Sequence, residues 1–106
     1  MSESSYRYTI AEGVPIEEVE ITLLLSILGV EALHGESQAR LDAGHTFSAA
    51  RHTVVIDAGT PVGRDLNKLF AGFLAKEFGS DSFKVERAEG VPRPQQPKSQ
   101  PEPVTA

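Results

Sequence analysis

Hydrophobic and polar positions alternate in three short segments of the chain, residues 6–10, 38–43 and 82–87. This period-two pattern is typical of strands that bury one face. A fourth short segment, residues 52–57 (His-Thr-Val-Val-Ile-Asp), is rich in β-branched side chains, which strands favour. The pattern therefore predicts four strands.

Two longer segments predict helices. The first, residues 15–34, opens on a proline, which suits the first helical position because its missing N–H would be unpaired there. Gly35 is expected to end this helix in the left-handed conformation. The second helix is predicted over residues 61–78, with Thr60 as its N-cap and Gly79 after its last turn.

The resulting order, β-α-β-β-α-β, resembles the ferredoxin-like plan, in which a four-stranded antiparallel sheet carries two helices on one face. Residues 44–51 would connect the middle strands as a hairpin. The resemblance rests on element order and covers residues 5–89, a length that supports one α+β domain. Residues 1–4 and the proline-rich tail 90–106 are expected to be disordered, because neither can bury enough apolar surface to fold.

Composition narrows the classes of function. The 106 residues include no cysteine, which excludes disulfides, thiolate metal sites and cysteine nucleophiles. A formal net charge of −5 argues against a broad surface for nucleic acid or anionic lipid. The first residues lack the basic and apolar regions of a signal peptide, so we expect a cytoplasmic protein that does not enter a membrane.

Strand parity also argues against RNA binding. RNA-binding domains on this plan stack bases on aromatic side chains of the open sheet face. Here Tyr6 and Tyr8 share their phase with Ile10, and Phe83 shares its phase with Val85. The aromatic side chains are thus predicted to lie in the core, and we expect no nucleic-acid partner.

The first helix carries apolar residues around almost its whole circumference, although a helix that covers a sheet needs an apolar arc of only about 100°. We therefore expect part of it to contact another chain, the alternative being that neighbouring elements of the same chain cover it. Small residues on one stripe would allow a second helix to approach closely, whether from this chain or another. The predicted interface residues are Thr22, Leu25, Ser26 and Gly29.

Gly72 lies inside the second helix, where glycine costs about 1 kcal/mol relative to alanine. We expect it to be there because a backbone or a ligand packs closely against it.

Residues that carry chemistry do not converge in any recognisable pattern. His34, His45 and His52 fall in separate elements without metal-ligand spacing, although His45 and His52 are placed to face each other across a hairpin. We therefore expect no metal site, no cofactor and no catalytic residues.

One turn combines several groups that could hold an anion at a helix N-terminus. A ligand site is predicted here, with turn and capping chemistry as the alternative use of the same residues. The candidate ligand-binding residues are Asp57, Gly59, Thr60 and Arg64.

Together these features predict a non-enzymatic protein-interaction or assembly module that self-associates or binds a partner protein. The tail offers a further contact, because a polyproline II segment can dock in an aromatic groove. The alternative is a regulatory domain, similar in plan to the ACT or PII type, that binds a small ligand at the turn over residues 57–64.

Overall fold

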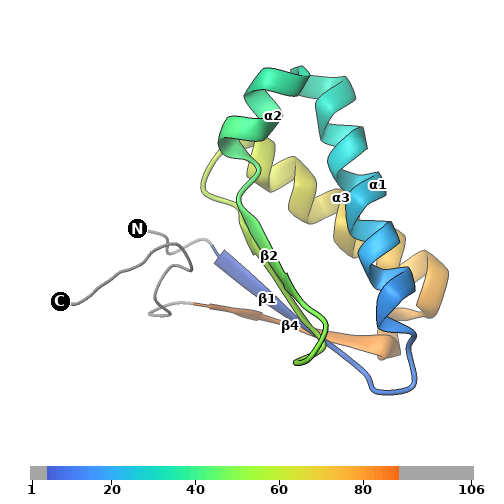
Figure 1. Cartoon of the computed structure of the whole chain (residues 1–106). Helices are drawn as coiled ribbons and strands as arrows, with labels where there is room; N and C mark the ends of the chain where they lie inside the picture. The colour runs from blue at the N-terminus through green and yellow to red at the C-terminus, as the bar shows by residue number, and fades with distance from the viewer. Residues whose placement is uncertain (1–4, 89–106) are drawn as a thin grey trace, which may run out of the picture.

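A four-stranded antiparallel sheet carries its helices on one face (Figure 1). The computed structural model describes residues 5–88, so the segments expected to be disordered, 1–4 and 90–106, lie outside the described residues. The class is α+β, as predicted. The elements are β1 (Ser5–Ile10), α1 (Ile16–His34), α2 (Glu36–Asp42), β2 (His45–Ser48), β3 (Thr53–Asp57), α3 (Pro61–Phe78), the 3-10 turn η1 (Ser80–Ser82) and β4 (Phe83–Arg87).

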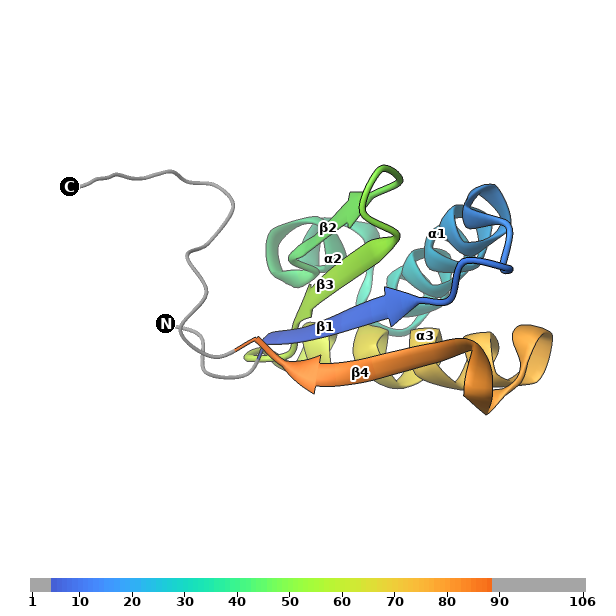
Figure 2. The ribbon, with the colours of Figure 1, turned by 90° about the horizontal axis from the view of Figure 1, so that it is seen from below.

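The strands lie in the order β2-β3-β1-β4 (Figure 2). The two middle strands, β3 and β1, are the ones that carry fully buried side chains. Tyr8 pairs with Val54 of β3 on one side and with Val85 of β4 on the other. Because side chains alternate across a strand, this register places Tyr8, Ile10, Val54 and Ile56 on the helix-covered face. All four are buried, and the predicted phase of the aromatic residues in β1 is therefore correct.

The expected strand over residues 38–43 is wrong, and with it the β-α-β-β-α-β order. These residues belong to α2, and the strand that pairs with β3 is β2. Helical spacing explains the difference: Arg40 pairs with Glu36, and Gln38 donates to Asp42 at 2.6 Å, both four residues apart. The order observed in residues 5–88 is β-α-α-β-β-α-β, with three α-helices in place of two.

The helix ends lie within one residue of their predicted positions, with differences in local conformation. Thr60 caps α3 by accepting a hydrogen bond from the backbone N–H of Gly63 at 2.9 Å. Pro15 is the N-cap of α1, one position before the predicted one. Gly35 and Gly79 follow the two long helices with φ of 91° and 90°, values that glycine adopts without a Cβ clash. Their ψ of 149° is more extended than the left-handed helical conformation expected for Gly35.

Tyr8 ties the sheet to α3. Its ring packs edge-on against Phe70, with centroids 4.9 Å apart, and its hydroxyl donates to the side-chain oxygen of Asn67 at 2.6 Å. Burial is the main reason why the pKa of Tyr8 is raised well above its usual value, and the neighbouring Tyr6 adds to the effect. The folded protein therefore holds the phenol protonated.

Tyr8→Phe tests this contact. At neutral pH the variant should be about 1 kcal/mol less stable, because the hydrogen bond is lost while the ring packing remains. Above about pH 10 an unfolded tyrosine ionises while folded Tyr8 does not, so wild-type stability falls with pH by a contribution that the variant lacks. The stability gap between the two proteins, measured by urea unfolding at several pH values, should narrow as the pH rises. A gap that stays constant or widens would contradict the burial of a protonated phenol.

Candidate interaction surface

One face of α1 builds the core. Val19, Leu23 and Val30 recur at four- and seven-residue spacing and are buried between α1 and the sheet. The buried hydroxyls beside them are satisfied within the helix: Ser26 donates to the carbonyl of Thr22 at 2.8 Å. Thr22 lies 3.0 Å from the carbonyl of Glu18. Burial is therefore complete on this side, and it needs no neighbouring chain.

The opposite face of α1 is also apolar, and it is exposed. Four large side chains on this face keep 53% to 58% of their surface in contact with solvent. Their spacing of three and four residues aligns them along the helix, so they form a continuous stripe. We call this set the outward stripe; it consists of Ile21, Leu24, Leu25 and Leu28.

Scattered single apolar residues are normal on a protein surface, but a contiguous apolar patch marks an interaction site. Fully burying a large aliphatic side chain is worth about 1.5–3 kcal/mol, so four that remain just over half exposed forgo roughly 3–6 kcal/mol per chain. That sum is comparable with the net stability of many small domains. The outward stripe is therefore the strongest candidate for a functional surface in the described residues.

The predicted interface residues divide between the two sides of α1. Thr22 and Ser26 are buried, and a Cβ on Gly29 would lie 2.9 Å from the Cδ1 of Leu69. The small residues therefore let α3 of the same chain approach, which answers the question of which helix they face. Leu25 alone of the four belongs to the outward stripe.

A shallow groove between α1 and α3 continues the apolar surface. Its volume is about 350 Å³, and Leu25 lies on one wall with Phe73 on the other. Thr22 and Glu77 join the helices at its floor, where hydroxyl and carboxylate oxygens are 3.1 Å apart. Lys76 completes the lining. The groove therefore has apolar walls and a charged rim.

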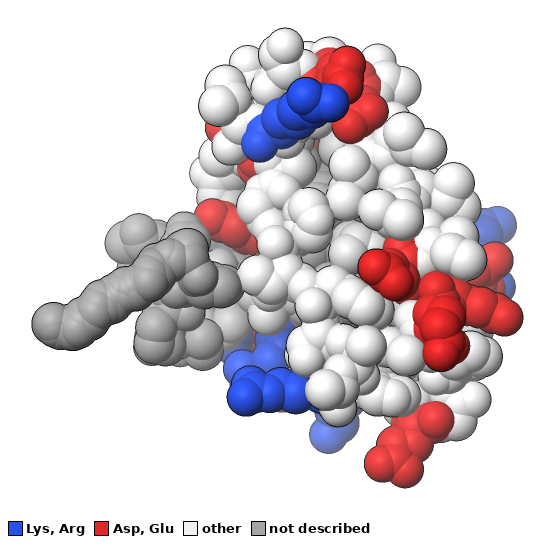
Figure 3. Space-filling model, viewed as in Figure 1, with Lys and Arg blue, Asp and Glu red and all other residues white. Residues whose placement is uncertain are grey.

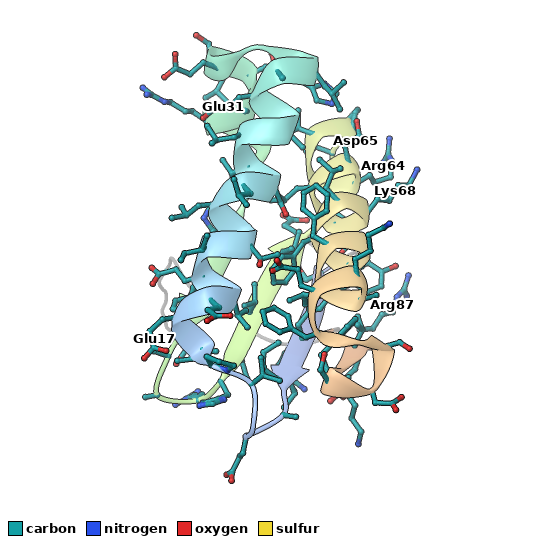
Figure 4. The ribbon with its side chains drawn as sticks, turned by 90° about the vertical axis from the view of Figure 1, so that its right-hand side faces the viewer. Glu17, Glu31, Arg64, Asp65, Lys68 and Arg87 are labelled. Atoms are coloured by element: carbon teal, nitrogen blue, oxygen red, sulfur yellow. The ribbon has the colours of Figure 1, made fainter. Side chains whose placement is uncertain are left out.

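Charge is distributed to the two sides of this helical layer. Glu17 and Glu31 lie along the outer edge of α1, whereas Arg64 and Lys68 lie along the outer edge of α3 (Figure 4). Glu20 shares the edge with Glu31, because eleven residues make three helical turns. Acidic side chains gather near the N-terminal end of α1, with uncharged surface beside them (Figure 3).

The turn predicted to bind a ligand uses its polar groups internally. Asp57 accepts a hydrogen bond from the backbone N–H of Gly59 at 2.9 Å, as in an Asx turn. Besides capping α3, Thr60 donates to the carbonyl of Asp42 at 3.0 Å, which fixes α2 to the start of α3. Arg64 is exposed on the first turn of α3. The turn thus joins Asp57, Gly59 and Thr60 in a local hydrogen-bonding and capping arrangement, and the side chain of Arg64 lies outside it.

The histidines remain apart. His34 lies 2.8 Å from the carboxylate of Asp65, at the point where the end of α1 meets the start of α3. His45 pairs with Ile56 in the sheet, whereas His52 lies in the turn at the far end of the hairpin, so the expectation that these two face each other is wrong. Among residues 5–88, no three His, Asp or Glu side chains gather closely enough to hold a metal ion.

The packing expected at Gly72 is also not found within this chain. A Cβ at this position would meet no atom within 4 Å, so the glycine faces open space on the outer side of α3.

No helix in residues 5–88 combines the length and apolar character needed to cross a membrane. No family model, curated protein or solved structure matches the chain.

Proposed function

We propose that this protein is a non-enzymatic interaction module whose binding surface is the outward stripe of α1, through which it self-associates or binds a partner protein. The observation that carries the proposal is the apolar character of both faces of α1. One face is fully used by the core, and the other leaves Leu24 and Leu28 54% and 58% exposed. Covering the outward stripe with protein removes this apolar surface from water.

We also propose that the scaffold is a ferredoxin-like plan into which α2 has been inserted. The sheet order β2-β3-β1-β4 with antiparallel neighbours supports this description, as do the two long helices on one face. In this arrangement α1 and α3 form an outer layer, and the sheet supports it from behind. The binding surface is thus built on rigid elements.

Site-specific photo-crosslinking tests the surface. A benzophenone side chain placed at position 28 lies on the outward stripe. One placed at position 41 lies on α2, where the native Leu41 side chain is 79% exposed. Irradiation in cells of the source organism should give a discrete protein adduct from position 28 and a much weaker one from position 41. The mass of the adduct distinguishes a second copy from a different partner.

Equal labelling from the two positions, or none from position 28, would refute the assignment of the binding surface. Circular dichroism of both purified variants serves as the folding control, because each modified side chain is largely exposed.

A further inference from the structure

We propose that the outward stripe is covered by a second copy of this chain, related by a twofold axis that runs along the groove between α1 and α3. In this dimer the acidic edge of each protomer faces the basic edge of the other. This inference rests on the proposed function and specifies its partner.

The two helices run in opposite directions. The contact between His34, the last residue of α1, and Asp65, the fifth residue of α3, fixes the end of one helix beside the start of the other. Glu31 therefore lies at the same level along the layer as Arg64 and Lys68 (Figure 4).

Rotation about an axis parallel to the helices keeps these levels and exchanges the two edges. Glu31 of one protomer then faces the basic edge of the other near Arg64 and Lys68. An axis across the helices would instead place acidic edge against acidic edge. Because like charges brought together disfavour association, the charge pattern selects the parallel axis.

The same axis places α1 of each protomer over α3 of the other. The outward stripe then needs room above α3, and Gly72 provides it, since nothing within 4 Å occupies the position of a Cβ. Phe73 and Leu25, on the two walls of the groove, lie nearest to the axis and contact their equivalents. The exposed glycine in the interior of α3 thus has a structural role in the dimer.

A charge-exchange experiment on the full-length chain tests this arrangement. One variant reverses the acidic edge, Glu20→Lys with Glu31→Lys, and the other reverses the basic edge, Arg64→Glu with Lys68→Glu. Each variant alone should dimerise at least about 10-fold more weakly than wild type, because its edges now repel. An equimolar mixture should form a heterodimer with a dissociation constant close to that of the wild-type dimer, because both contacts are attractive again.

The acidic-edge variant gives the more decisive test, because its substitutions bring the formal net charge of −5 closer to zero. General repulsion between chains predicts tighter association for this variant, whereas the proposed dimer predicts weaker association. Sedimentation equilibrium gives the dissociation constants, and native mass spectrometry identifies the heterodimer by mass. Raising the salt concentration should weaken the wild-type dimer, since these contacts lie at an exposed edge.

Variants that dimerise as tightly as wild type, or a mixture that gains no affinity over its components, would overturn the proposed axis. A wild-type chain that remains monomeric would overturn the second copy as partner, while an adduct to another protein at position 28 would still support the proposed function. If circular dichroism shows that a reversed variant is unfolded, the neutral set decides: Glu20→Gln with Glu31→Gln, and Arg64→Gln with Lys68→Gln. Each should weaken the dimer, and their mixture should recover part of the lost affinity, because one of the two contacts in the heterodimer again pairs an acidic edge with a basic edge. A mixture that recovers none of it would overturn the proposed axis.

Discussion

Gly63→Ala should be among the most destabilising single substitutions in this protein. A Cβ at Gly63 would overlap the backbone carbonyl oxygen of Asp57, which cannot rotate away as a side chain can. We expect a loss at or above the upper end of the roughly 1–3 kcal/mol that overpacking costs. For a domain of this size that loss lowers the midpoint of thermal unfolding by more than about 10 °C.

Gly72→Ala is the matched control, because it introduces the same methyl group into the same helix at a position with open space. It should stabilise the monomer by about 1 kcal/mol through helix propensity. Thermal and urea unfolding at concentrations below dimerisation give both values. Equal effects of the two substitutions would contradict the close approach of α3 to the end of β3, and with it the geometry of the turn at Asp57.

The pair Leu24→Gln and Leu28→Gln should weaken association strongly while leaving the monomer folded. Both side chains are more than half exposed, and glutamine has a helix propensity close to that of leucine, so little of the core or of the helix is disturbed. In a twofold dimer each substitution acts twice. Because 1.4 kcal/mol is a factor of ten in affinity, the dissociation constant should rise at least about 100-fold.

Leu41→Gln is the control for this pair, since Leu41 is 79% exposed but lies on α2, outside the outward stripe. Its dissociation constant should match that of wild type. If Leu41→Gln weakened association as strongly as the pair, the interface would have to be placed elsewhere. Unchanged unfolding curves for the monomeric variants would show that the effect belongs to the surface.

The elements that the sequence predicts correctly are those with strong local signals. Thr60 followed by a proline, and glycine after each long helix, mark ends that the structure reproduces. β1 and β3 have a clear hydrophobic pattern and lie in the middle of the sheet, where the side chains that face the helices have to be apolar because they are buried. Residues 38–43 do not predict α2 because their alternating pattern is also typical of a strand. The same six residues place Ala39 and Ala43 four apart, which is a helical spacing, and the contact of Gln38 with Asp42, also four apart, favours the helix.

Only part of the candidate surface could be predicted from the sequence. A helix that is apolar all round does not reveal which side faces the sheet, so Thr22 and Ser26 were grouped with Leu25 although they lie toward α3. The contact between Gly29 and Leu69 depends on how two helices cross, which no local pattern encodes. Ile21, Leu24 and Leu28 emerge as the exposed set only when the opposite face is seen to be buried.

Sedimentation equilibrium of the full-length wild-type chain, from submicromolar to high micromolar concentration, tests most directly whether a second copy covers α1. The measured mass should rise with concentration from the 11.4 kDa of one chain to twice that value and level off there. It should level off because a twofold contact is closed and leaves no second stripe to propagate. A mass that stays at 11.4 kDa over the whole range would contradict the account, because the outward stripe would then remain in water in the absence of any other protein.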